Sequence, residues 1–145
     1  MKRTVIGWRE WVALPLFGVT IKAKVDTGAA SASLHAFNLE RFTGDGTEMV
    51  RFDIHPRQRS AKGATTVEAE VVDERHVRNP GGRAETRPVI RTRLRWAEVV
   101  WEAEINLTRR DEMGFRMLLG RKALKNQFVV DPGRSFLGGR PGKEK

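Results

Sequence analysis

The sequence predicts an all-β domain, either a small barrel or a sandwich, with one short helix near its C-terminal end. Most apolar residues alternate with polar ones at the two-residue period of a strand. Clusters of glycine, proline, asparagine and aspartate separate these runs at short intervals, and helical periodicity is scarce. Many short strands with few helices are typical of barrels and sandwiches. The 145 residues are enough for one such domain with its own core.

Strands are expected along the whole chain. Alternation predicts strands at residues 19–25 and 49–55, and a long strand at 67–77. Short apolar runs at 128–130 and 135–137 add two more near the end of the sequence. These segments account for most of the apolar residues outside the hairpin described next.

The clearest element is a hairpin over residues 89–107, with a two-residue turn at Ala97 and Glu98. In this register one face is mostly apolar, and the other carries pairs of opposite charge, which favour the register. The facing pairs are Trp96–Val99, Leu94–Trp101, Thr92–Ala103, Ile90–Ile105, Arg93–Glu102 and Arg91–Glu104. The turn residues are poor ones for a tight hairpin, so a slipped register or a longer loop stays open.

Helices are expected at two places, both short. Residues 121–127, which follow Gly120, are predicted to form about two turns, and residues 36–41 to form one. We expect a single domain over residues 1–138 and a disordered basic tail over 139–145.

The amino-acid composition indicates the cellular compartment in which the protein is expected. The chain has no cysteine, which excludes a disulfide framework and a thiolate zinc site and suits a reducing cytosol. No run near the N-terminus is apolar and long enough for a signal peptide or a membrane helix. We therefore expect a soluble cytoplasmic protein that does not enter a membrane.

The net charge of +9 is unevenly distributed. Residues 1–60 carry nine basic and six acidic side chains, residues 61–108 carry eight of each, and residues 109–145 carry ten basic and four acidic ones. Such an excess attracts polyanions such as nucleic acid, an anionic membrane surface or an acidic peptide. A merely basic soluble protein is the simpler alternative.

Asp26, Thr27 and Gly28 are the candidate catalytic residues. They follow directly on the alternating strand 19–25, so the carboxylate would be held at a strand end before a glycine turn. Thr27 can fix the turn by a local hydrogen bond, and Gly28 allows a second backbone or a substrate to come close. Taken alone, Asp-Thr-Gly is also an ordinary turn sequence.

A second element gives the aspartate a context. Residues 116–121 form an apolar run that ends in Gly120 and Arg121, ahead of the predicted helix. The pairing of Asp-Thr-Gly-Ala with a later apolar-apolar-Gly-Arg resembles the retropepsins, the single-domain aspartic proteases of retroviral type. The resemblance implies a retropepsin-like barrel in which the apolar strand runs beside the aspartate loop and shields it. The two elements lie 94 residues apart here, which implies an insertion relative to the viral enzymes.

The sequence is more similar to one bacterial group. The similarity rests on residues 8–15, 21–29, 33–36, 87–92 and 113–121, and it covers the chain from about Val5 to Leu137. This group is often labelled as ATP-dependent zinc proteases and has been reinterpreted as retropepsin-like. The residues do not support that label, because the sequence contains neither a P-loop nor a His-Glu-x-x-His motif. We expect no cofactor and no metal, with one alternative left open, the convergence of His35, His55 and His76 on a metal.

The resemblance implies aspartic endopeptidase chemistry, which needs two carboxylates that share a proton. The chain has one Asp-Thr-Gly, so we expect a homodimer with Asp26 from each subunit. Ala30 and Ser31 stand where viral enzymes often carry acidic residues that pair with the later arginine. Arg121 lacks that partner and is free to face the substrate.

The resemblance also implies a substrate, because one member of the group is associated with trimming oligoglutamate tails from a ribosomal protein. Basic side chains would bind such a tail through charge-assisted hydrogen bonds. The substrate-binding candidates are Lys24, Ala29, Arg87, Arg91, Arg116 and Arg121, with Arg75 as a weaker one.

Several alternatives stay open. Arg91 can instead pair with Glu104 on the hairpin surface. Residues 79–86 are either a flap over the cleft or a plain connection. The whole chain is alternatively a non-catalytic basic module that binds RNA or a ribosomal protein. Nucleic acid is the less favoured partner, because the chain has no tyrosine and no recognised RNA-binding motif.

Overall fold

A computed structural model describes residues 3–57, 62–78, 81–82, 84–109 and 114–139. Within these ranges the chain forms strands and one short helix, α1. The elements in order are β1 (Thr4–Leu14), β2 (Val19–Val25), β3 (Ala32–His35), β4 (Phe37–Gly44), β5 (Thr47–Ile54), β6 (Thr65–Glu70), β7 (Asp73–Arg78), β8 (Ala84–Trp96), β9 (Val99–Thr108), β10 (Met117–Leu119), α1 (Arg121–Leu124) and β11 (Phe128–Ser135). No helix among the described residues is long and apolar enough to cross a membrane.

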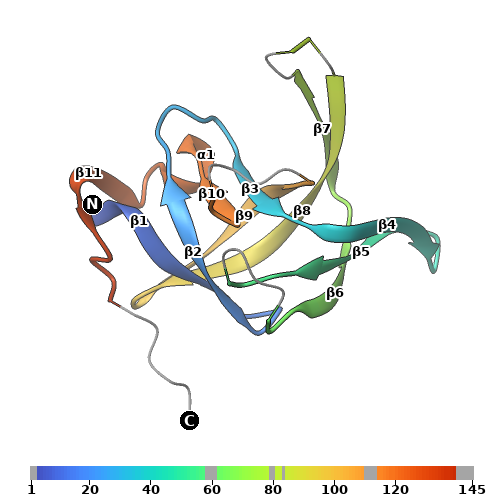
Figure 1. Cartoon of the computed structure of the whole chain (residues 1–145), viewed down its shortest axis with the longest axis horizontal. Helices are drawn as coiled ribbons and strands as arrows, with labels where there is room; N and C mark the ends of the chain where they lie inside the picture. Colours follow the sequence, from blue (N-terminus) through green and yellow to red (C-terminus); the bar gives the residue numbers. More distant parts are fainter. Residues whose placement is uncertain (1–2, 58–61, 79–80, 83, 110–113, 140–145) are drawn as a thin grey trace.

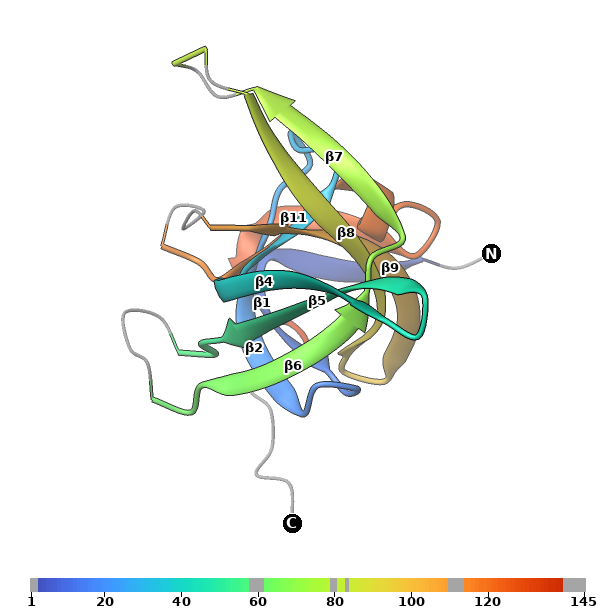
Figure 2. The same cartoon turned by 90° about the vertical axis from the view of Figure 1, so that its right-hand side faces the viewer.

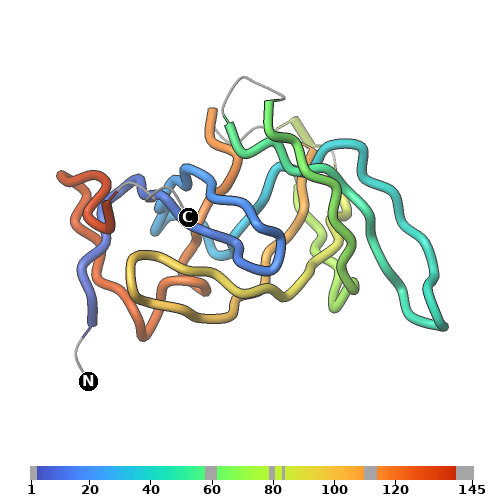
Figure 3. Tube along the Cα trace, turned by 90° about the horizontal axis from the view of Figure 1, so that it is seen from below, coloured from blue at the N-terminus to red at the C-terminus, as the bar shows by residue number. Residues whose placement is uncertain are grey.

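Six strands close into a barrel in the order β1, β2, β10, β3, β9, β8 (Figure 1). Ala13 of β1 pairs with Arg95 of β8 and completes the ring. Strand β11 pairs in parallel with β1 outside the ring, so the first and last strands lie side by side (Figure 3). Inward side chains alternate with outward ones along β2, whereas β3 and β10 are buried at every residue. The buried apolar side chains form one core. The expected all-β barrel with a short C-terminal helix is confirmed.

A second sheet, β4–β5–β6, lies across the barrel (Figure 2). Val50, Phe52 and Ile54 of β5 are fully buried in the same core as the barrel side chains. Phe52 meets Phe17 edge to face, with ring centroids 6.1 Å apart. The alternation at 49–55 therefore correctly predicted a strand, whose inward face joins the two sheets.

The hairpin at 89–107 has the predicted register, from Val89–Asn106 to Trp96–Val99. Ala97 takes a positive φ of 51°, the conformation that a two-residue turn demands. On the outer face Arg91 Nη2 donates to Glu104 Oε2 at 2.9 Å. The unfavourable turn sequence was overridden by the buried face, since a slip of one residue would expose every apolar side chain.

The predicted long strand at 67–77 is wrong, because two strands in different sheets occupy it. β6 ends at Glu70 and β7 begins at Asp73. The Val71 N–H donates to Glu48 O, and the next N–H, that of Val72, donates to Val89 O. The chain thus changes partner between these two residues while its apolar alternation continues.

The predicted helical turn at 36–41 is also wrong. These residues enter β4, where Phe37 pairs with Asp53 of β5. Asn38 has a φ of 52° and donates from Nδ2 to Asp53 Oδ2 at 2.7 Å, and the pairing register shifts there. A side-chain bond across the sheet thus fixes a bulge at Asn38 that short-range patterning does not reveal.

The C-terminal elements differ from prediction in length. α1 ends at Leu124, because Lys125 is extended and Asn126 has a φ of 70°. The run predicted at 128–130 lies in one longer strand, β11, whereas only Ser135 of the run predicted at 135–137 belongs to it, because Phe136 leaves the strand with a φ of 55°. Residues 140–145 of the expected disordered tail lie outside the described residues.

The hairpin of β7 and β8 extends away from the barrel (Figures 1 and 2). At its base, Arg41 of β4 binds Glu74 of β7 through two hydrogen bonds of 2.6 and 2.7 Å. These hydrogen bonds lower the pKa of the Glu74 carboxyl. Of the expected flap segment 79–86, residues 84–86 pair with β7 in this hairpin, and Asn79, Pro80 and Arg83 lie outside the described residues.

Candidate active site

The aspartate loop begins where β2 ends. The Asp26 N–H donates to Leu119 O at 2.9 Å, which continues the parallel pairing of β2 with β10. Within the loop the Gly28 N–H donates to Asp26 Oδ1 at 2.8 Å, and the Ala29 N–H donates to Asp26 O at 3.2 Å. Oδ2 accepts no hydrogen bond from any described residue. The half-buried carboxylate is therefore oriented through one oxygen and keeps the other available.

The start of α1 holds the loop from the other side. The backbone N–H groups of Arg121 and Lys122 donate to Ala29 O and Ala30 O at 2.8 and 3.0 Å. The Arg121 side chain donates from Nη1 to Thr27 O at 3.0 Å. Arg121 thus touches the backbone of the candidate catalytic tripeptide, a contact that the sequence comparison with viral enzymes did not predict.

Gly120 allows this contact. A Cβ atom at this position would lie 2.4 Å from Ser31 O and 2.8 Å from Ala29 O, closer than side chains approach backbone. The apolar-apolar-Gly-Arg pattern and Asp-Thr-Gly are thus parts of one structure, joined at a point where only glycine fits.

Arg87 is built into the wall of the barrel. It is 6% exposed, and its Nη1 donates to Asn106 Oδ1 at 3.1 Å while its Nε donates to Glu85 at 3.0 Å. Asn106 Oδ1 also accepts from Ser33 Oγ, and Asn106 Nδ2 donates to Ala32 O. This network joins β3, β8 and β9 directly after the aspartate loop. Sequence reasoning missed Asn106. The available signal was a polar amide between two apolar residues of a predicted strand, Ile105 and Leu107.

Arg116 lies in an aromatic cluster at the other end of β10. It is 8% exposed, its guanidinium sits 4.8 Å from the Phe37 ring centroid, and its Nη1 is 3.5 Å from His35 Nδ1. Phe37 is stacked between His35 and His55, with centroid distances of 4.1 and 3.6 Å. Sequence reasoning missed this cluster, because it placed Phe37 in a helical turn instead of in β4 beside β5.

The three histidines do not converge. His35 and His55 lie on opposite faces of Phe37, and His76 on β7 bonds Thr86 at 3.2 Å. In the ranges that the structure describes, no group of three or more His, Cys, Asp or Glu side chains could hold a metal ion.

The remaining candidates lie on either side of the loop. Lys24 is half-buried on β2, two residues before Asp26, and strand alternation extended by one residue would put both side chains on the same side. Arg91 and Arg75 border a pocket that also includes Ser31 from the end of the aspartate loop. The structure therefore brings Thr27, Gly28, Ala29 and Arg121 together around Asp26 and distributes the other arginines over separate surroundings.

Comparison with known proteins identifies the family. The family model described as retropepsin-like aspartic endopeptidase RimB matches residues 5–141. Three similar curated proteins are each named as a probable alpha-L-glutamate ligase. They come from Shewanella pealeana (45% identity over 95% of this chain), Desulfotalea psychrophila (41% over 98%) and Parasynechococcus marenigrum (45% over 90%). The chain spans only 30%, 31% and 28% of their respective lengths.

A solved structure is also similar. The crystal structure of Lpg0085 from Legionella pneumophila, a protein described as of unknown function, is 31% identical to this chain. The match has a TM-score of 0.79 and covers 94% of this chain and 99% of the other. Together with the match of the family model to nearly the whole sequence, this agreement in fold shows that the chain belongs to the RimB-like family of retropepsin-like aspartic endopeptidases.

Proposed function

We propose that the chain is an aspartic endopeptidase that cleaves a glutamate-rich peptide tail, and that it works as a homodimer. The observation that carries the proposal is the aspartate loop. Its backbone is fixed by Leu119 and by the first residues of α1, while Oδ2 of Asp26 stays without a partner among the described residues. A rigid backbone that presents an available carboxylate oxygen is suited to act on a water molecule.

The reaction needs two such carboxylates. One takes a proton from water as the oxygen attacks the scissile carbonyl carbon, and the other donates a proton to the carbonyl oxygen. The tetrahedral intermediate then collapses, the C–N bond breaks, and the leaving nitrogen accepts a proton. Two carboxyl groups held close together share one proton, because both cannot remain ionised.

A second subunit is the proposed source of the second carboxylate. No described acidic residue is joined to Asp26 by a hydrogen bond. Val129 on the edge strand β11 and its paired neighbour Val5 on the adjacent strand β1 are 50% and 46% exposed. An exposed apolar pair at a sheet edge favours association with another chain.

Charge and the related proteins support an acidic substrate. The net charge of +9 attracts glutamate-rich segments. The similar curated proteins, in which this region is about a third of the length, are named for ligation of L-glutamate. We propose the oligoglutamate extension of a ribosomal protein as the substrate, and the cytoplasm as the place of reaction. Lys24, two residues before Asp26, is the nearest basic candidate along the sequence.

The test is cleavage of a peptide that ends in several glutamates by the wild type and by Asp26→Asn. Asparagine keeps the shape and removes the ionisable group, so only the wild type should cleave. Asp45→Asn, in the exposed β4–β5 turn, is the matched control and should cleave like the wild type. Addition of a chelator should change nothing, and α- and γ-linked peptides tested in parallel identify the bond.

Mixed subunits test the dimer. Equal amounts of wild type and Asp26→Asn should give clearly less than half of the wild-type activity, because most dimers then contain an inactive subunit. Equal cleavage by wild type and Asp26→Asn would refute the aspartate mechanism. Binding of RNA without cleavage of any peptide would favour the basic binding module instead.

A further inference from the structure

We infer that a pocket beside the aspartate loop binds a glutamate carboxylate of the substrate tail, at a subsite away from the scissile bond. This inference rests on the proposed function and adds a binding site to it. The pocket has a volume of about 340 Å³, enough for a side chain. Its polar lining residues are Ser31, Arg75, Arg91, Glu102, Glu104 and Lys122.

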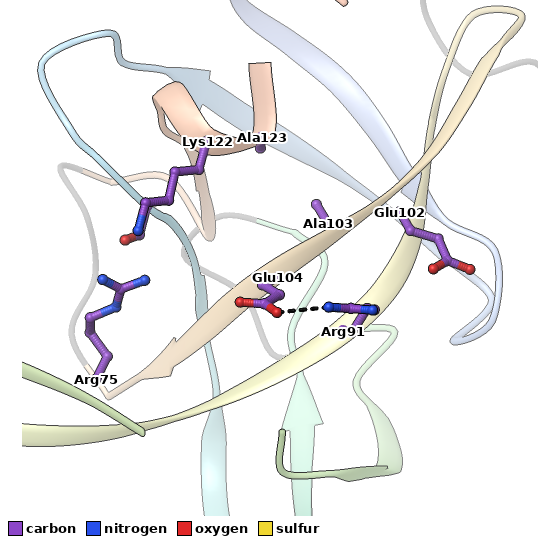
Figure 4. Close-up of a pocket in the computed structure, with 8 residues that line it drawn as sticks. Arg75, Arg91, Glu102, Ala103, Glu104, Lys122 and Ala123 are labelled. Atoms are coloured by element: carbon purple, nitrogen blue, oxygen red, sulfur yellow. Dashed lines mark hydrogen bonds and ion pairs between the residues drawn. The ribbon is translucent and has the colours of Figure 1, made fainter. Parts of the chain in front are cut away.

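Two cations extend into this pocket from opposite sides. Arg75 comes from β7 and Lys122 from α1, and their side chains point toward one another (Figure 4). Neither forms an ion pair with a described residue, and Arg75 Nε is buried without a hydrogen-bond partner. Two like charges that converge repel each other, and an unbonded buried donor costs free energy. An anion between them would remove both penalties.

The acidic residues of the pocket do not fill this position. Glu104 is bound to Arg91 at 2.9 Å, and Glu102 lies at the far end with its carboxylate pointing away from Arg75 and Lys122 (Figure 4). Three cations and two carboxylates line the pocket in total, so its charge is net positive. Arginine and lysine donors are suited to a carboxylate, to which guanidinium can donate two parallel hydrogen bonds.

The pocket is joined to the catalytic loop through the backbone. Ser31 lies five residues after Asp26, and the backbone N–H of Lys122 donates to Ala30 O at 3.0 Å. The segment that supports the aspartate therefore also supplies one of the two cations. In an extended peptide, every second side chain points the same way, at about 6–7 Å intervals. A tail of successive glutamates thus offers a carboxylate at regular intervals, so that one can occupy the pocket while a peptide bond elsewhere in the tail meets Asp26.

Binding can be measured without cleavage. The probe is α-linked hexaglutamate, titrated by calorimetry into Asp26→Asn and into double variants that add Arg75→Gln or Lys122→Gln. Each addition should weaken binding about tenfold, because one charge-assisted contact is lost. Lys125→Gln is the matched control, since Lys125 is an exposed lysine just after α1 that does not line the pocket. It should change binding less than twofold.

Changes in the peptide provide the second half of the test. Hexaglutamates with one glutamate replaced by glutamine should reveal one position at which replacement weakens binding to Asp26→Asn and has no further effect once Arg75 is changed. An equal loss from Lys125→Gln, or no such position, would overturn the subsite in favour of general charge attraction. A loss of binding to a single-stranded oligonucleotide alone, with hexaglutamate unaffected, would also overturn it.

The two proposals fail separately. If hexaglutamate binding depends on Arg75 and Lys122 while no peptide is cleaved, the subsite stands and the protease assignment falls. If the peptide is cleaved through Asp26 while the two variants bind like their parent, the protease assignment stands and the subsite falls. Thermal unfolding midpoints within about 2 °C of the parent confirm that each variant is folded.

Discussion

Two carboxylates of this protein, Glu10 and Asp26, occupy opposite kinds of site. Glu10 is fully buried and accepts four hydrogen bonds, from the backbone N–H groups of Gly7, Leu137 and Gly138 and from the indole N–H of Trp96, at 2.7–3.1 Å. Asp26 is half-buried and accepts one side-chain hydrogen bond, from the Gly28 N–H. The same chemical group is saturated with donors in one place and left largely without them in the other.

The difference is the one expected between a structural role for Glu10 and the proposed chemical role of Asp26. Glu10 fastens β1 to β8 and to the residues after β11, so its oxygens are used up by the fold. At Asp26 the fold holds the backbone and leaves the carboxylate oxygen Oδ2 unused. Sequence reasoning singled out Asp26 and missed Glu10, because Glu10 lies in a strand with ordinary polar neighbours and has no motif.

Exchange of each carboxylate for its amide should separate activity from stability most sharply. Asp26→Asn should lower kcat by about a thousandfold or more, because the proposed general acid–base group is lost, while the unfolding midpoint stays close to that of the wild type. Glu10→Gln should do the reverse and lower the unfolding midpoint. Peptide cleavage and thermal unfolding of the same two samples check the prediction, and a large drop in stability for Asp26→Asn would contradict it.

Removal of the buried carboxylate should be among the most destabilising single changes. Glu10→Ala leaves four N–H donors without their acceptor and should lower the free energy of unfolding by about 3–5 kcal/mol. Urea unfolding measures this. Glu98→Ala, in an exposed turn, is the control and should change the free energy by less than about 0.5 kcal/mol.

A methyl group at Gly120 should lower both the stability and the activity of the protein. Gly120→Ala places a Cβ against the carbonyl oxygens of Ser31 and Ala29, so the aspartate loop must move. We expect a loss of about 1–3 kcal/mol in stability together with a large loss of activity. Gly81→Ala is the control for stability, because a Cβ there would meet no atom within 4 Å.

A smaller effect is expected from the arginine that touches the loop. Arg121→Gln removes the hydrogen bond from Nη1 to Thr27 O, an exposed contact, and should lower kcat several-fold with little change in the unfolding midpoint. Arg121→Lys should restore part of the activity. If KM rises while kcat is unchanged, Arg121 binds the substrate directly instead of positioning the loop.

The Asp53 carboxylate accepts two hydrogen bonds, more than Asp26 and fewer than Glu10, and its replacement should have the smallest effect on stability. Hydrogen bonds from the Thr66 hydroxyl and from Asn38 lower its pKa below the ordinary value. Because the folded pKa is the lower one, the stabilisation is present above the unfolded pKa of about 4 and is lost as the pH falls through the folded pKa. Asp53→Asn should therefore flatten the pH dependence of urea unfolding below about pH 4, and an unchanged slope there would contradict this.

The sequence correctly predicted those features of the fold that depend on residues close together in the chain. The period of two at residues 19–25 and the charge pairs at 89–107 correctly gave strands, and in the hairpin the register. The strand at 67–77 was wrong, because the alternation continues while the hydrogen-bond partner changes between Val71 and Val72. Partner choice between sheets is set by distant residues and leaves no local trace.

In the candidate site, too, the sequence located the local motifs but not the contacts between distant residues. The motif located Asp26 and the Gly120–Arg121 element, and the structure joins them. The basic residues were chosen by charge alone, so the burial of Arg87 and Arg116 in networks was not foreseen. Lys122 was passed over because its significance lies in its distance from Arg75, which only the folded chain defines.

The pairing of the first strand with the last has a consequence during synthesis. Thr4 pairs with Phe128, and Asp26 takes its position from residues 94 positions further along, where Arg121 binds Thr27. Such a topology has a high contact order and folds slowly, because long loops must close before their contacts form. A nascent chain that has emerged only as far as β9 has no aspartate site at all. The proposed proteolytic activity would therefore arise only after nearly the whole domain has left the ribosome.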